Sequence, residues 1–271
     1  MTGRTFAEKI FDAPAGSIVF KKPDIVLSHD NTSSIGSTFN KMDGQKVADP
    51  DQLLVILDHN APPTDAKLAN QYQKIRDIVK QQGVTKFHDV GDGICHQIMA
   101  NYAKPGMLIV GSDSHTGTAG AFNAFAAGID RTETAGLWKL GETWFRVPET
   151  LKITLKGQLQ KGVFAKDLSL WIIGMIGSSG ADYMSVEFHG EGVKSIENEI
   201  FYTTPEMAKK LALLDLNKEE FANKVVSMTT PRPMNYSIII KVNKGTIQLL
   251  KNKYQIWRWG QTDAVYNHLK N

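Results

Sequence analysis

The chain has 271 residues, which is enough for one large domain or two ordinary ones. Hydrophobic residues at 42% and charged residues at 22% are typical of a soluble globular protein. The formal net charge of +3 comes without a dense Lys/Arg block, so we expect no nucleic-acid partner. No apolar run reaches the ~18 residues of a membrane-spanning helix, and the N-terminus lacks a signal-peptide pattern. We therefore expect no membrane association and a cytoplasmic protein.

The sequence contains a single cysteine, Cys95, so an internal disulfide is excluded. An iron–sulfur site held by four cysteines cannot be built from this sequence alone. Because free cysteines are usually buried, we interpret Cys95 as a small hydrophobic residue and not as a nucleophile.

Short apolar runs alternate with helical or loop segments between residues 24 and 130. Runs of this kind, bounded by polar turns, fit strands that are buried on both faces. Because helical segments separate the runs, we predict a three-layer α/β/α domain with a mostly parallel sheet over residues 1–147. The runs lie at 25–27, at 53–57, near Phe87 and at 107–110.

Two helices are expected within this region. The first is an amphipathic helix before Phe87, with Thr64 as its N-cap and Gly83 at its C-terminal end. The second is a closely packed, buried helix over residues 120–136, a segment rich in alanine and glycine.

The pattern from residue 148 to residue 196 predicts the start of a second α/β unit. Residues 151–155 and 184–188 have the character of strands, and residues 165–176 that of an apolar helix.

Residues 197–271 form a C-terminal tail in which we expect a helix over 206–216 and a strand over 236–242. The end of the tail is aromatic and basic, a composition also found in single-strand nucleic-acid sites. We interpret it instead as a surface-packed or poorly ordered terminus.

A histidine follows each of the four apolar runs, and carboxylates accompany them. In open parallel sheets, ligands bind beyond the carboxyl ends of the strands. If the four runs form one sheet, these side chains converge. Imidazole titrates near neutral pH and a neighbouring carboxylate raises its basicity, so the group suits acid/base chemistry. Its members are His29, His59, His96 and His115, with Asp30, Asp58 and Asp113.

The remaining histidines have simpler interpretations. A lone histidine beside a strand is more often a hydrogen-bonded structural residue, and we interpret His88 in that way and His189 as a turn residue. A zinc hydrolase would also use His and Asp, but neither HxH nor HExxH spacing occurs. We therefore assign no metal ligands.

Seven strings between about residue 5 and residue 196 occur together in a known family. They are LSHDNT, LDHNAPP, DVGDGICHQI, GSDSHTGT, WFRVPETLKITLKGQL, AKDLSLWIIGMIG and EFHGEGVKSI. Through them the chain resembles the aconitase superfamily, in its 3-isopropylmalate dehydratase and homoaconitase branch. The resemblance implies a hydro-lyase that interconverts isomeric hydroxy acids by removing and re-adding water, in leucine biosynthesis for isopropylmalate. Homoaconitate and 2,3-dimethylmalate are alternative substrates. A [4Fe–4S] cluster with one open iron acts as the Lewis acid in this family.

The resemblance also implies roles for individual residues. Asp58 and His59 match the family's DH pair, whose histidine protonates the departing hydroxyl. His96 matches the histidine of the GICHQ string, and Asp113 the carboxylate that pairs with it. His115 matches the DSH histidine beside the cluster and substrate. The substrate-binding positions implied are His29, Asp30, Ser114 and Thr116.

The sequence departs from the family pattern downstream. The family's cluster cysteines lie in a Cys-Thr-Asn-type segment and a later CxxC, and neither string occurs here. The family's catalytic serine belongs to a separate small subunit with a swivelling domain, which is the expected partner. Two interpretations stay open. The chain is part of a hydro-lyase large subunit, or it is a catalytically incomplete, truncated homologue or non-catalytic subunit that binds a hydroxy-dicarboxylate.

Overall fold

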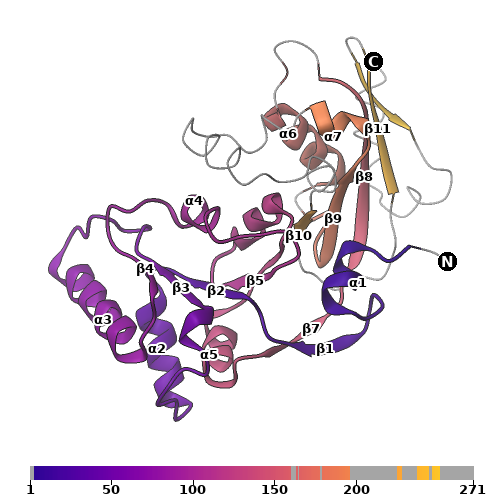
Figure 1. Ribbon diagram of the computed structural model, residues 1–271. Coiled ribbons are helices and arrows are strands. Elements are labelled where there is room, and N and C mark those ends of the chain that lie inside the picture. The colour runs from indigo at the N-terminus through magenta and orange to yellow at the C-terminus, as the bar shows by residue number, and fades with distance from the viewer. Residues whose placement is uncertain are drawn as a thin grey trace. The chain divides into compact units, whose positions relative to one another are not determined.

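The computed structural model (Figure 1) divides into two compact units, Met1–Val147 and Pro148–Asn271. None of the helices in the described part of the chain has the length and apolar character that crossing a bilayer requires. The helix expected over 206–216 and the aromatic end of the tail lie outside the described residues. The structure describes residues 3–159, 163, 165–177, 179–195, 225–227, 237–243 and 246–250.

A five-stranded sheet forms the centre of unit 1, and all four of its strand pairings are parallel. Every residue of β2, β3 and β5 is buried, as the continuous apolar runs predicted. The predicted α/β fold class is therefore confirmed. In spatial order the strands are β4 (Lys86–His88), β3 (Leu53–Ile56), β2 (Ile25–Ser28), β5 (Leu108–Gly111) and β6 (Phe125–Gly128).

The order of the strands creates a switch point between β2 and β5. From β2 the chain builds outward through β3 and β4, and it then returns to the other side of β2 to form β5 and β6. The loops that leave β2 and β5 therefore diverge. A crevice beyond the carboxyl ends of such strands is the usual ligand site of open α/β sheets.

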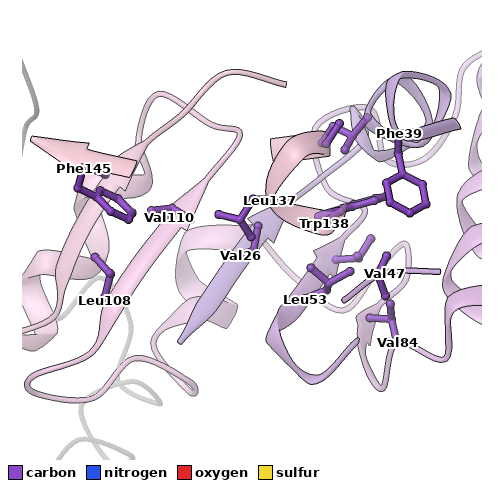
Figure 2. Packing of buried hydrophobic residues seen from close by; sticks show 14 of the residues in the cluster. Val26, Phe39, Val47, Leu53, Val84, Leu108, Val110, Leu137, Trp138 and Phe145 are labelled. Carbon is purple, nitrogen blue, oxygen red and sulfur yellow. The ribbon is translucent and has the colours of Figure 1, made fainter. Parts of the chain in front are cut away.

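Helices α2 (Thr32–Lys41), α3 (Ala66–Gln82) and α5 (Arg131–Leu140) lie on one side of this sheet, and α4 (Cys95–Met99) lies on the other (Figure 1). The first three helices bury large side chains against alternate strand residues. Figure 2 shows part of this core, including Phe39 of α2 and Trp138 of α5, whose ring centroids are 6.0 Å apart. The sheet is thus covered on both faces.

The helix predicted before Phe87 exists as α3, but its N-cap differs from the prediction. The Asp65 side chain accepts a hydrogen bond from the backbone N–H of Leu68, so Asp65 and not Thr64 is the cap. Gly83 ends the helix in the left-handed conformation, as predicted.

The prediction of one buried helix over 120–136 is wrong. The segment contains the end of a 3₁₀ helix, η2 (Thr116–Phe122), then β6, then the start of α5. Asn123 adopts a left-handed backbone with φ of 58°, and the 3₁₀ helix η2 ends at this residue. The apolar residues that follow pair with β5 instead of continuing a helix. A short buried run rich in alanine and glycine does not distinguish helix from strand.

Unit 1 also contains the short helix α1 (Phe6–Phe11) and an antiparallel ribbon of β1 (Ile18–Lys21) and β7 (Thr143–Arg146). Phe20 and Trp144 are opposite each other in this ribbon, and both are more than half exposed.

Unit 2 is built on a second five-stranded sheet, ordered β10–β9–β8–β11–β12. β8 pairs in parallel with β9 and β11, and the two outer strands pair antiparallel. Leu151, Ile153 and Leu155 of β8 share a core with α6. The strands predicted at 151–155, 184–188 and 236–242 and the helix at Ala165–Ile176 correspond to observed elements. Their bounds are β8 Glu149–Gly157, α6 Ala165–Ile176, β9 Met184–His189, α7 Glu191–Ser195, β10 Val225–Ser227, β11 Ser237–Asn243 and β12 Thr246–Leu250.

Replacing Ile109 with alanine should lower the free energy of unfolding by about 3 kcal/mol, because it removes buried methyl groups and leaves a cavity in the sheet core. Ile109 is fully buried, whereas Ile18 of the ribbon is 70% exposed. Ile18→Ala, the matched control, should therefore cost less than about 0.5 kcal/mol. Urea denaturation measures both, and equal losses would contradict the burial of β5 on both faces.

Candidate active site

Four loops of unit 1 bring histidines to the carboxyl edge of the parallel sheet. His29 follows β2, and His59 lies three residues after β3. His96 is in α4, which follows β4, and His115 lies after β5. Because parallel strands end at the same edge, these four side chains come from points far apart in the sequence to one region.

The carboxylate of Asp113 lies in the middle of the four imidazoles. Its Oδ1 is 2.9 Å from His96 Nε2 and 3.5 Å from His115 Nδ1. Its Oδ2 is 3.4 Å from His59 Nε2 and 3.9 Å from His29 Nε2. The structure thus gathers four histidines around the side chain of Asp113, which is only 8% exposed.

The ionised form of Asp113 is favoured despite its burial. Burial raises the pKa of this carboxyl, but the backbone N–H of His115 and the neighbouring imidazoles outweigh it, so the pKa is lowered overall. The N–H of His115 donates to Oδ1 at 2.7 Å. Asp113 therefore supplies a negative charge at neutral pH.

Two glycines allow the loop that carries Asp113 to pack closely. A Cβ on Gly111 would lie 2.6 Å from Thr116 Oγ1 and 2.9 Å from the Leu27 side chain. A Cβ on Gly128 would lie 2.9 Å from the Asp113 carbonyl oxygen. Any other residue at these positions would move the loop, so both glycines help to fix Asp113.

His59 and Asp58 form a pair with a defined orientation. Asp58 Oδ1 is 2.7 Å from His59 Nδ1, and Asp58 Oδ2 accepts the backbone N–H of Cys95 at 2.7 Å. The other ring nitrogen, Nε2, faces Asp113. Burial lowers the pKa of His59, but the carboxylates of Asp58 and Asp113 outweigh this and raise it above 6.5. His59 is therefore suited to carry a proton at neutral pH.

His29 has the opposite character. Its ring stacks on that of His59 with centroids 3.8 Å apart. Burial, and then the nearby charge of His59, lower the pKa of His29. Burial therefore favours the neutral form of His29, whereas the carboxylates around His59 favour its protonated form.

Asn31 orients His29 and was missed by the sequence analysis. Its side-chain amide lies 2.9 Å from His29 Nε2 and donates to the Ser112 carbonyl at 2.8 Å. The Ser112 hydroxyl donates to Asn31 Oδ1 at 3.1 Å. This side chain thus links the loops after β2 and β5 at the switch point. Its position directly after His29-Asp30 was the only signal for it in the sequence.

Asp30 and Thr116, two of the expected substrate-binding residues, are buried and hydrogen-bonded. Asp30 is 5% exposed, and its two oxygens accept five hydrogen bonds of 2.6–3.4 Å. Thr116 is 1% exposed and donates to the Asp113 carbonyl. We interpret both as positioning residues. The five donors to Asp30 are the backbone N–H groups of Asp58, His59 and Asn60, the Asn60 amide and the Tyr72 hydroxyl.

Ser114 and His115 lie at the open side of the group. Both residues are exposed, and the His115 side chain has 77% of its surface accessible. The Ser114 hydroxyl is 3.3 Å from His115 Nδ1. These two side chains are therefore accessible from solvent.

His88 and His189 take other partners. His88 ends β4, and its ring lies 2.8 Å from the Tyr102 hydroxyl and 3.3 Å from Asp92. His189 is the last residue of β9 and not a turn residue, and its ring contacts Glu187 at 2.9 Å.

The residues of this chain do not fit a [4Fe–4S] cluster. Such clusters are held by thiolates, and Cys95 is the only cysteine of the sequence. Its side chain is fully buried, and burial together with the Asp58 carboxylate raises the pKa of the thiol. Cys95 therefore stays protonated, and its backbone N–H serves to hold Asp58.

Asp30→Asn should destabilise the protein by about 2–3 kcal/mol at neutral pH, because an amide cannot accept all of the donors around this position. Hydrogen bonds from Tyr72 and Asn60 outweigh burial and lower the Asp30 pKa from its usual 3.8. The carboxylate therefore stabilises the fold above that value, and this contribution is lost as the pH falls through the folded-state pKa.

The difference in unfolding free energy between Asp30→Asn and the native protein should thus shrink below about pH 4. Urea denaturation at neutral and acid pH measures it. Asp77→Asn on the exposed face of α3 is the control and should change stability by less than about 0.5 kcal/mol at either pH. A pH-independent loss in Asp30→Asn would argue against an ionised Asp30.

Residues 6–212 match the Aconitase family (aconitate hydratase). The chain is 41% identical over 203 residues to 3-isopropylmalate dehydratase large subunit 1 of Methanopyrus kandleri, covering 72% of this chain and 49% of that protein. It is 42% identical over 214 residues to 3-isopropylmalate dehydratase large subunit 1 of Thermotoga maritima, covering 76% and 51%. With the methanogen homoaconitase large subunit of Methanocaldococcus jannaschii it shares 38% identity over 211 residues, 75% of this chain and 50% of that one.

The chain spans about half the length of the curated relatives that it matches. The match covers unit 1, including every residue of the histidine group, and the first part of unit 2. This chain belongs to the aconitase family.

Proposed function

We propose that the chain is the histidine- and aspartate-bearing part of a hydro-lyase large subunit that acts on a malate-type hydroxy-dicarboxylate. The observation that carries the proposal is the Asp113 carboxylate among four imidazoles at the switch point of a parallel sheet. Relatives named as 3-isopropylmalate dehydratase large subunits support isopropylmalate as the substrate. One named as a homoaconitase supports homoaconitate as the alternative, and 2,3-dimethylmalate remains compatible.

His59 is the proposed proton donor to the departing hydroxyl group. Asp58 holds its Nδ1, which leaves Nε2 directed toward Asp113 and the other imidazoles. A histidine fixed by a carboxylate in this way keeps one tautomer and one ring orientation, and general acid catalysis requires both. His29, which stacks on His59, is proposed to keep the ring in place and to contact the substrate.

His96 and His115 are proposed to act on the other side of Asp113. The short contact between His96 and the Asp113 carboxylate is suited to moving a proton within the site. His115 and Ser114 at the exposed side are proposed to contact a substrate carboxylate.

The proposed activity needs cysteine ligands that this sequence does not contain. Because this chain does not fit the iron–sulfur cluster, we derive no step through it, and cysteine ligands would have to come from elsewhere. The relatives are named as large subunits, which supports a small subunit as a partner. The second candidate function is binding of a hydroxy-dicarboxylate without catalysis, which the single, buried cysteine favours.

Reconstituted anaerobically with iron and sulfide, the chain by itself should retain no cluster after gel filtration, because it offers no set of thiolates. Iron and acid-labile sulfide assays measure this. About four irons per chain would contradict the assignment and would mean that cysteines from a further chain complete the site.

His59→Gln should weaken the binding of 3-isopropylmalate about tenfold, or about 1.4 kcal/mol, because it removes a charged partner of the substrate. Isothermal titration in a buffer with a metal chelator measures the affinity. His88→Gln, which changes a histidine bound to Tyr102, is the matched control and should bind as the native protein does. Equal affinity in the His59 and His88 variants would contradict the proposed site.

A further inference from the structure

Three side chains of the types that bind metal ions lie close together at the exposed side of the histidine group. They are His96 from α4 and Asp113 and His115 from the loop after β5. Asp113 Oδ1 is 2.9 Å from His96 Nε2 and 3.5 Å from His115 Nδ1. One ligand atom from each residue lies within 4.8 Å of the other two.

The two separations from Asp113 are close to what a tetrahedral ion requires. With metal–ligand bonds of about 2.0–2.1 Å, tetrahedral ligand atoms are roughly 3.3 Å apart. The two separations from Asp113 lie on either side of that value, so small side-chain rotations suffice to admit an ion. Two imidazoles and a carboxylate are donors that Zn²⁺ and its neighbours in the first transition series bind.

We propose that His96, Asp113 and His115 bind a single divalent transition-metal ion, such as Zn²⁺. This goes beyond the proposed hydro-lyase function and does not depend on it. It also departs from the sequence-based assignment of no metal ligands. The spacing of these residues along the chain matches no zinc motif, because the ligands come together only when the sheet forms.

The surroundings of Asp113 support the site. Its carboxylate is oriented by the N–H of His115 and, on the side away from the proposed ion, by the rings of His59 and His29. The Thr116 hydroxyl fixes the backbone of the same residue. Groups of this kind around a metal ligand orient it and strengthen metal binding.

The exposure of His115 leaves room for a fourth ligand. Its side chain is 77% exposed, so water or a small molecule has access to an ion at this position. Three protein ligands with one open position are typical of zinc sites that bind an exchangeable ligand.

The neighbouring group of His29, Asp30, Asp58 and His59 is less suited to a metal. The oxygens of Asp30 already accept five hydrogen bonds. Those of Asp58 accept one from Cys95 and face His59. An ion there would have to displace these partners. At the proposed site Asp113 Oδ1 also accepts one backbone N–H, from His115, but its other contacts are with the rings of His96 and His115, which would themselves be ligands.

The full chain is first treated with a chelator and is then titrated with ZnSO₄ in a calorimeter. In a separate titration with CoCl₂ the visible spectrum is recorded. No substrate is present in either experiment. We expect about one ion per chain, and a tetrahedral Co²⁺ spectrum. His115→Ala should weaken Zn²⁺ binding at least tenfold without loss of folding, because the side chain is exposed. Asp113→Asn should weaken it further.

His189→Gln in unit 2 is the matched control, because it removes a histidine that pairs with Glu187, and it should bind Zn²⁺ as the native chain does. Absence of Zn²⁺ binding, or equal binding by native chain and His115→Ala, would overturn the proposal. Loss of binding in His59→Gln with full binding in His115→Ala would also overturn it. Since the titration uses metal alone, its result is separate from that of the isopropylmalate titration.

Discussion

The arrangement of the four histidines depends on their contacts with the Asp113 carboxylate. Four imidazoles that repel one another when protonated gather around one negative charge at the carboxyl edge of a parallel sheet. The strand order that places β5 beside β2 brings this charge to the switch point. Two glycines let its loop pack without displacement, so backbone and electrostatics fix the same residue.

A second buried carboxylate, Asp30, connects this site to the fold. It holds the backbone of residues 58–60 and the Tyr72 hydroxyl of α3, so the loop that carries His59 is anchored to a core helix. The two aspartates thus have different roles. Both oxygens of Asp30 accept hydrogen bonds that hold the loop, whereas the oxygens of Asp113 face the four imidazoles. Cys95 belongs to the same support through its backbone N–H, which binds Asp58.

Much of unit 1 could be predicted because its strands are buried on both faces and therefore appear as continuous apolar runs. The histidines after those runs identified the region of the site. The helix predicted over 120–136 is wrong, because a short run of alanine and phenylalanine fits either period, and only pairing with β5 decides it. The hydrogen bonds of Asn31 and Asp30 join residues more than 25 positions apart in the sequence. No local sequence pattern predicts such contacts.

The claim that Asp113 organises the four histidines is tested most directly by NMR. The histidine resonances of the metal-free native chain are compared with those of Asp113→Asn. The account predicts that the imidazole signals of His29, His59, His96 and His115 all shift, because each ring lies within 4 Å of this carboxylate. Signals of His88 and His189, which pair with other groups, should stay in place. A change confined to one histidine, or an equal change in these six of the seven histidines, would contradict a site organised around Asp113.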